Sequence, residues 1–245
     1  MAGSTLDAIP SGSRVFLDAT VFIYHFTGHS LECRRLFERC ERGELGGVTC
    51  SAAVAEVTHR LMMIEAVSRG LVTAGHVVRK LRERPDDVRQ LHVHQTQIDR
   101  IALMGVEVAP VDLDTMVRSA HFRCRYGLLT SDSIVAACAD ALSIRLLASA
   151  DPDFAVIDGL ALHCPGDLPA GDPSRISRRL TGRSATSRSA RLKPCPTDED
   201  RGPMAGQWEL SGLSRVRACR LARHVPVIAG LLVAALPAGA GGCCS

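Results

Sequence analysis

The chain has 245 residues, of which 46% are hydrophobic and 22% are charged, with a formal net charge of +3, as in a soluble globular protein of one large or two small domains. The N-terminus lacks a signal-peptide pattern, and only 10 residues separate Pro226 from Pro237 in the longest apolar run, so a membrane helix is excluded and a cytoplasmic protein is expected. The ten cysteines include no C-x-x-C pair, which excludes a zinc knuckle and a thioredoxin-like motif.

Strand and helix patterns alternate along the first two thirds of the chain. Short apolar runs predict strands, and apolar residues at helical spacing predict helices. In chain order we expect a strand at 13–19, a short helix, a helix at 30–43, a strand at 46–50, helices at 51–70, 73–85 and 86–105, a strand at 106–111, helices at 113–127 and 131–143, and strands at 144–149 and 160–164. Strands separated by helices predict a parallel sheet covered on both faces.

Single residues mark the expected helix ends. Ser51 is a candidate N-cap for the helix at 51–70. Gly43 and Gly70 are placed to end helices, and Pro85 is expected to end the helix at 73–85.

The composition changes near Gly166. Residues 1–170 carry 17 basic and 21 acidic side chains, a net charge of −4, whereas residues 171–245 carry 12 and 5, a net charge of +7. The second region is rich in Arg, Ser, Pro and Gly, and it has too little apolar surface to offset the entropy of ordering. We therefore expect one domain over residues 12–166 and a low-complexity basic tail over 167–245, disordered rather than an arm that binds nucleic acid.

Acidic residues recur where the expected strands run into helices. In a parallel sheet, ligands gather at the carboxyl ends of the strands. The acids at these junctions are Asp18, Glu56, Asp132 and Asp151, with Asp153 two residues further on. Asp18 stands out, because a carboxylate inside the apolar run VFLDATVFIYHF is costly unless a cation or several donors meet it.

Converging carboxylates point to a metal ion. Two unit charges ~4 Å apart repel by ~4 kcal/mol at an effective dielectric constant of 20, and the acids would raise one another's pKa values. Oxygen ligands favour Mg²⁺ or Mn²⁺ over zinc, and Mg²⁺ keeps waters, one of which can attack a phosphodiester. Each acid alone is more often a helix cap or dipole partner, so the prediction depends on the whole set.

The same residues resemble a known family. VFLDATVFIYHF resembles the opening of PIN-domain ribonucleases, especially the VapC-type toxins of bacterial and archaeal toxin–antitoxin pairs. SAAVAEVTHRL is similar to the family's second acidic motif, with Glu56 in place. GLLTSDSIVAACADALSIRLLASADPDF is similar to the third and fourth motifs, with Asp132 and Asp151. The resemblance covers residues 13–165.

This resemblance implies a PIN-like three-layer α/β/α fold with a mainly parallel central sheet, and a metal-dependent endoribonuclease. It assigns metal binding and catalysis, with Mg²⁺ or Mn²⁺, to Asp18, Glu56, Asp132 and Asp151. Asp153 is an additional candidate ligand. Thr20 stands where Asn or Ser is common in the family, and its hydroxyl is expected to orient a water or an acid. The implied partners are an RNA substrate, a small antitoxin protein and a second copy of the chain.

Other functions fit less well. A haloacid-dehalogenase-type phosphatase needs a second Asp where Thr20 stands, and neither Lys80 nor Lys193 supplies its lysine. A dinucleotide fold needs a Gly-rich first turn, which DATVF lacks. His92 and His94 would not share a helix face, so they are expected to be core or surface histidines. The alternative that stays open is a PIN-like module that binds RNA or protein without cutting, although binding alone would not need four costly carboxylates.

Overall fold

The structure, a computed structural model, describes residues 4–168. Six parallel strands form one sheet in the order β1-β6-β5-β2-β3-β4. They are β1 (Ser4–Thr5), β2 (Arg14–Leu17), β3 (Gly46–Cys50), β4 (Val106–Ala109), β5 (Leu146–Ala148) and β6 (Ala161–Cys164). The expected α/β fold with a parallel central sheet is therefore confirmed.

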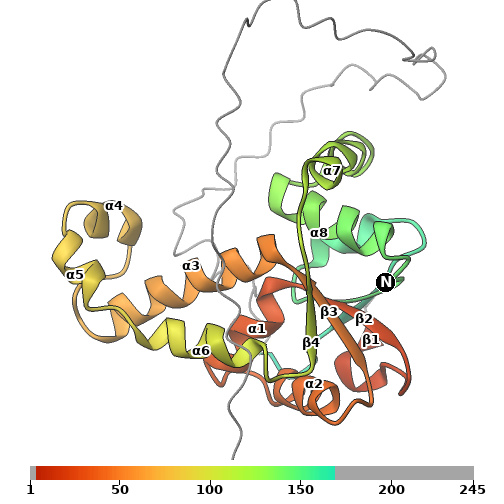
Figure 1. Ribbon diagram of the computed structural model, residues 1–245, viewed down its shortest axis with the longest axis horizontal. Helices are drawn as coiled ribbons and strands as arrows, with labels where there is room; N and C mark the ends of the chain where they lie inside the picture. The colour runs from red at the N-terminus through yellow and green to blue at the C-terminus, as the bar shows by residue number, and fades with distance from the viewer. Residues whose placement is uncertain (1–3, 169–245) are drawn as a thin grey trace, which may run out of the picture. The chain divides into compact units, whose positions relative to one another are not determined.

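Helices connect and flank the strands, as Figure 1 shows. They are α1 (Ala19–Phe26), α2 (Leu31–Glu41), α3 (Ser51–Ser68), α4 (Val77–Arg82), α5 (Pro85–Arg89), α6 (Val93–Ile101), α7 (Leu113–Tyr126) and α8 (Thr130–Ala141), with 3-10 turns η1 (Leu6–Ala8) and η2 (Pro152–Val156). From β2 the chain adds β3 and β4 on one side and later returns to β5 on the other side. The carboxyl ends of β2, β3 and β5 therefore meet where the strand order reverses, which is the usual position of a site in such sheets.

The central strands explain the continuous apolar runs in the sequence. Val15, Phe16 and Leu17 of β2 are fully buried, and so are Leu147 and Ala148 of β5. A strand between two helical layers buries side chains on both faces, so its apolar residues do not alternate with polar ones. Leu17 is thus the last core residue of β2, and Asp18 directly after it lies at the end of the sheet.

Two expected helices have different bounds in the structure. The predicted helix at 86–105 is wrong, because α5 and α6 are separate helices. Pro85 begins α5 and does not end the preceding helix, since proline lacks an N–H and suits the first helical position. α4 covers only part of 73–85, and His76 before it has a left-handed φ of 51°.

The sequence predicted Ser51 as the N-cap of α3, and this prediction is wrong. α3 begins at Ser51, and Cys50 occupies the cap position without a side-chain hydrogen bond. The Ser51 hydroxyl instead accepts from the Val111 N–H at 3.1 Å. Gly43 and Gly70 follow helix ends with φ values of 71° and 70°, as expected.

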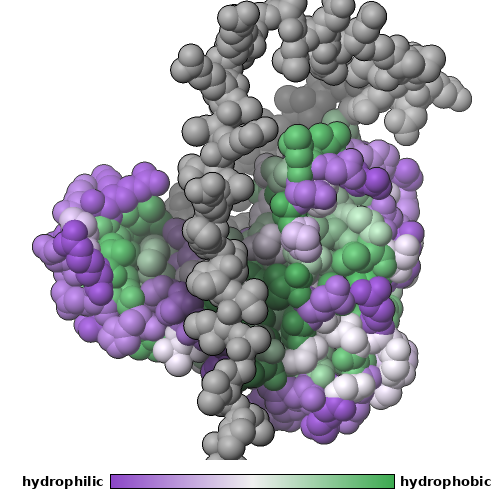
Figure 2. All heavy atoms as spheres, viewed as in Figure 1, coloured by the Kyte–Doolittle hydropathy of each residue, from purple (hydrophilic) through white to green (hydrophobic). Residues whose placement is uncertain are grey.

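A projection made of the end of α3 with α4, α5 and the start of α6 has a small core of its own. Figure 1 shows α3 leaving the sheet toward α4 and α5, and α6 returning. Figure 2 shows hydrophilic side chains over α4 and α5, with apolar ones between them. The buried residues of this second core are Met63, Ala66, Val72, Val77, Leu81 and Leu91.

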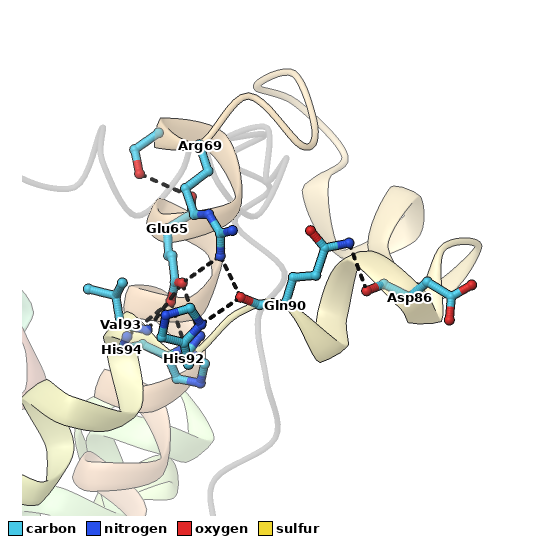
Figure 3. Close-up of polar contacts among 8 residues, drawn as sticks. Glu65, Arg69, Asp86, Gln90, His92, Val93 and His94 are labelled. Atoms are coloured by element: carbon cyan, nitrogen blue, oxygen red, sulfur yellow. Dashed lines mark hydrogen bonds and ion pairs between the residues drawn. The ribbon is translucent and has the colours of Figure 1, made fainter.

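A buried carboxylate, Glu65, ties α3 to the start of α6 (Figure 3). It accepts hydrogen bonds from the backbone N–H groups of His92, Val93 and His94 at 3.0, 3.1 and 3.0 Å. The Nδ1 atom of His94 lies 2.8 Å from Oε2, and Arg69 pairs with Oε1 at 3.4 Å. Burial alone would raise the pKa of Glu65, but these hydrogen bonds outweigh it and lower the pKa to about 2. His94 is thus a buried structural residue, which agrees with the expectation that His92 and His94 are core or surface histidines.

The folded unit extends beyond residues 12–166. Leu6 and Ile9 are buried in the main core, and β1 pairs with β6. Asp167 caps α2, because its carboxylate accepts from the Ser30 hydroxyl at 2.6 Å and from the backbone N–H groups of the first helical turn. Within residues 4–168, no helix has the length and hydrophobicity needed to cross a membrane. The expected disorder of the tail concerns residues that lie almost wholly outside those the structure describes.

Candidate active site

Asp18 lies at the carboxyl end of β2, where it is the N-cap of α1 and is only 6% exposed. Its Oδ2 atom accepts hydrogen bonds from the Thr20 N–H at 3.2 Å, the Thr20 hydroxyl at 2.7 Å and the Ser149 hydroxyl at 2.8 Å. Burial raises the pKa of Asp18, and repulsion from Glu56 adds to this, while the Thr20 and Ser149 donors lower it. The pKa remains raised, so neutral donors offset only part of the cost of this buried charge.

The hydroxyls of Thr20 and Ser149 join the loop after β5 to Asp18. Their oxygens lie 3.2 Å apart. The Thr20 hydroxyl accepts from the Ala150 N–H at 2.9 Å, and the Ser149 hydroxyl accepts from the Asp151 N–H at 3.0 Å. Each hydroxyl thus has an incoming backbone donor, which directs its own proton toward Asp18. Sequence reasoning had included Thr20 but missed Ser149, whose only signal was its place between β5 and Asp151.

Asp132 lies in the first turn of α8, where the charges of the other acids act on it. Burial raises its pKa to about 7, and repulsion from other carboxylates adds to the effect; these belong to Asp18, Asp151, Glu56 and Asp153. Five acids therefore lie near one another. Asp18, Glu56, Asp151 and Asp153 follow strands, whereas α8 follows α7 directly, so the expected strand–helix junction at Asp132 is wrong. A carboxyl group with this pKa is half protonated near neutral pH, so a cation would displace its proton and would bind more tightly as the pH rises through about 7.

Glu56 lies in the second turn of α3 and is held on both oxygens. Oε2 accepts from the Ser131 hydroxyl of α8 at 2.7 Å, and Oε1 lies 3.2 Å from the Arg60 guanidinium one turn further along α3. Sequence reasoning had not identified Ser131 or Arg60. Arg60 could have been noticed only by its spacing of four from Glu56, which many solvated helix pairs share.

Asp151 and Asp153 occupy the turn after β5. The Oδ1 atom of Asp151 accepts from the Asp153 N–H at 2.9 Å, which makes Asp151 the N-cap of η2. Asp153 is exposed, whereas Asp151 is half-buried. Asp151 therefore lies deeper than Asp153, although both contribute to the raised pKa of Asp132.

A hard divalent ion fits the donor chemistry of these acids. Within residues 4–168, no group of three or more His, Cys, Asp or Glu side chains has an arrangement that could hold a metal ion. The carboxylates are nevertheless close enough to raise the pKa of Asp132, and their oxygens are the ligand type that Mg²⁺ and Mn²⁺ prefer. Glu56 and Asp151 accept hydrogen bonds from neighbouring groups. The acids thus lie near one another but do not have the spacing of metal ligands.

Comparisons with known proteins agree with this architecture. A family model described as the PIN domain matches residues 15–160, a range that contains all four predicted acids. A search of curated proteins found no significant match.

Similar solved structures have low sequence identity. They include VapBC2 from Rickettsia felis bound to a DNA fragment from its promoter, with 17% identity, a TM-score of 0.41 and coverage of 62% of this chain and 98% of that chain. A toxin–antitoxin complex from Klebsiella pneumoniae has 22% identity, a TM-score of 0.38 and coverage of 60% and 94%. VapC20 of Mycobacterium tuberculosis, a toxin that cleaves the sarcin–ricin loop, has 15% identity, a TM-score of 0.40 and coverage of 58% and 92%.

Proposed function

This chain belongs to the PIN-domain family, and from that premise we propose that it is a metal-dependent endoribonuclease that hydrolyses RNA phosphodiester bonds. The supporting observation is that Asp18, Glu56, Asp132, Asp151 and Asp153 lie close together within the matched domain, where burial and then the other four acids raise the pKa of Asp132. A module that only binds RNA or protein would gain nothing from carboxylates that raise one another's pKa. The motif resemblance to VapC-type proteins supports the further proposal that this nuclease is the toxin of a toxin–antitoxin pair in the cytoplasm.

In this mechanism, the metal ligands would be Asp18, Glu56, Asp132 and Asp151, directly or through water. A bound Mg²⁺ or Mn²⁺ would polarise the phosphate and activate a water for attack. Thr20 and Ser149 orient Asp18 through their hydroxyls, so Thr20 would orient an acid, one of the two roles expected for it. Asp132 would give up its proton to solvent when a cation is bound, and Asp153, at the exposed rim, would be an additional ligand or an orienting group.

An assay of the purified protein with labelled RNA tests this proposal. RNA should be cut in Mg²⁺ or Mn²⁺ and should remain whole in EDTA, because four converging carboxylates without a cation cannot stabilise the charge that develops at phosphorus. Binding of RNA in both conditions with no cut product would favour the module that binds without cutting.

Metal binding should also stabilise the folded protein. A ligand that binds only the folded state adds ~2.7 kcal/mol at ~100 times its dissociation constant. For a domain of this size we expect the melting temperature to rise by roughly 5–10 °C with Mn²⁺. Calorimetric scans with and without the ion would measure this. The gain should shrink sharply in Asp18→Asn and Asp132→Asn, each of which removes one ligand charge.

Two acids of α7 provide matched controls for the metal experiment. Asp112 caps α7 by accepting from the Thr115 N–H at 2.8 Å, and Asp114 pairs with Arg118 at 2.8 Å. Asn is an equally good cap, so Asp112→Asn should keep the helix. The Mn²⁺ effect should persist in Asp112→Asn and Asp114→Asn. Similar losses in all four variants would mean that the ion binds general surface charge, which would contradict the proposed site.

The proposed protein partners are a small antitoxin and a second copy of the chain. α7 presents Leu113, Met116 and Val117, spaced three and four residues apart, as exposed apolar side chains on one helix face. Figure 2 shows apolar side chains on the part of the surface where Figure 1 places α7. The preceding strand, β4, is one of the two outer strands of the sheet. We assign this face to the second copy, because exposed apolar stripes usually mark interfaces.

Truncation tests the proposed division into a nuclease domain and a tail. Deleting residues 171–245 should leave activity and melting temperature nearly unchanged, because every acid of the site precedes that segment. Deleting residues 166–245 also removes Asp167, which caps α2. Loss of a cap costs ~1 kcal/mol, so this second variant should melt roughly 2–4 °C lower. A large loss of stability in the shorter deletion would show that the tail contributes to the fold.

A further inference from the structure

α3 carries two glutamate–arginine pairs with the same spacing but in different surroundings. Glu65 and Arg69 lie at the projection, where they tie α3 to α6 (Figure 3). Glu56 and Arg60 lie at the other end of the helix, within the acidic centre. The Arg60 side chain is only 13% exposed and that of Glu56 32%. Removing a guanidinium from water is costly unless a carboxylate pairs with it, and Glu56 supplies that carboxylate.

The contacts of Glu56 come from two helices and use both carboxylate oxygens. Arg60 approaches Oε1 at 3.2 Å from the same helix. Ser131 donates to Oε2 at 2.7 Å from α8, although it lies 75 residues away in sequence. Ser131 directly precedes Asp132, the acid whose pKa is raised to about 7. The three residues Arg60, Glu56 and Ser131, which we call the Glu56 clamp, thus connect α3 with the start of α8 across the acidic centre.

We infer that Arg60 and Ser131 are positioning residues, which hold Glu56 at the centre in a fixed orientation, and that Arg60 also balances part of the negative charge there. This inference rests on the proposed function, because it assigns Glu56 a task in the metal-dependent reaction. With one hydrogen-bond partner on each oxygen, Glu56 is held in one orientation, and each oxygen keeps a lone pair for the ion or for a water bound to it. Arg60 supplies a permanent positive charge, which competes with a divalent cation for the same carboxylates.

The two positioning residues should have different effects when they are removed. Arg60→Gln deletes a positive charge beside the acids, so the centre becomes more negative and Mn²⁺ should bind roughly three- to tenfold more tightly. It also frees Glu56, so kcat should fall about 10–100-fold, as for other groups that orient metal ligands. Ser131→Ala removes a neutral donor, so kcat should fall about tenfold while the Mn²⁺ dissociation constant changes less than about twofold.

The experiment combines calorimetric titration with Mn²⁺ in the absence of RNA, kinetics on an RNA oligonucleotide, and melting in EDTA. Arg60→Lys keeps the charge, so its Mn²⁺ affinity should stay near that of the wild type and its kcat should recover in part. Arg69→Gln is the matched control with the same spacing on the same helix. It should lower the melting temperature and leave Mn²⁺ affinity and kcat unchanged, because Arg69 lies at the projection.

Three outcomes are decisive. Equal Mn²⁺ affinity in Arg60→Gln and the wild type would overturn the inference, whether or not RNA is cut. A raised KM with unchanged kcat would also overturn it, because Arg60 would then bind RNA rather than position Glu56. Tighter Mn²⁺ binding in Arg60→Gln, in a protein that cuts no RNA, would support the clamp and contradict the proposed nuclease.

Discussion

Asp18→Asn should abolish RNA cleavage, with a loss of about 10³-fold or more, while the fold stays intact. Asp18 is the deepest acid of the centre and lies at the end of the central strand. Asn keeps an oxygen that can accept from the Thr20 and Ser149 hydroxyls, so the local hydrogen bonds can persist. What it removes is the negative charge that a divalent ion needs. Cleavage of labelled RNA by the purified variant in Mn²⁺ measures the effect.

The stability of the same variant separates a functional acid from a structural one. Burial raises the pKa of Asp18 in the folded protein. The free energy of unfolding therefore falls as the pH rises from the unfolded pKa of this acid to its folded pKa. Removing this charge should therefore leave the metal-free protein equally or more stable at neutral pH, with a smaller gain at acidic pH. Melting in EDTA at both pH values would test this.

Asp114→Asn is a suitable control for Asp18→Asn, since Asp114 pairs with Arg118 on an exposed helix. It should retain full cleavage and nearly the same melting temperature, because surface ion pairs contribute little. If Asp18→Asn melts at a clearly lower temperature in EDTA, Asp18 is a structural acid and its assignment to a metal site is wrong.

Glu65→Ala should be the most destabilising of the substitutions considered. The change leaves the N–H groups of His92, Val93 and His94 without their acceptor, and it removes the buried partner of the His94 ring. Breaking such a buried network costs ~3 kcal/mol, which corresponds to a fall in melting temperature of roughly 6–12 °C for a domain of this size. Thermal unfolding at neutral pH measures the change.

The pH dependence of this effect provides a second test. The pKa of Glu65 is lowered from 4.5 to about 2, so its contribution to stability is complete above the unfolded pKa and is lost as the pH falls toward 2. The difference between wild type and Glu65→Ala should therefore shrink below about pH 4. Glu83→Ala, at an exposed position after α4, should match the wild type throughout. A difference that stays constant down to pH 3 would show that lost packing, not the carboxylate, causes the effect.

The sequence by itself determined the order of the main elements and the places of the acids. Apolar runs identified β2, β3 and β5 because a doubly covered strand is apolar on both faces. Gly43 and Gly70 predicted helix ends because glycine adopts a positive φ without strain. Asp18, Glu56 and Asp151 could be selected because strand–helix junctions in a parallel sheet face a common edge. Asp132 follows α7 and not a strand, so that rule does not account for its position.

Only the tertiary structure decided which side chains meet there. Ser149 reaches Asp18 across 131 residues, and Ser131 reaches Glu56 across 75. It also decided that Glu65 caps α6, that Pro85 begins a helix, and that β1 adds to the sheet beside β6. The hydrophobic periodicity of a segment depends only on its own residues, and it indicates whether the segment is a helix or a strand and which of its faces is buried. A hydrogen bond between distant residues depends on strand order and helix orientation, which the packing of the whole chain sets and no short stretch encodes.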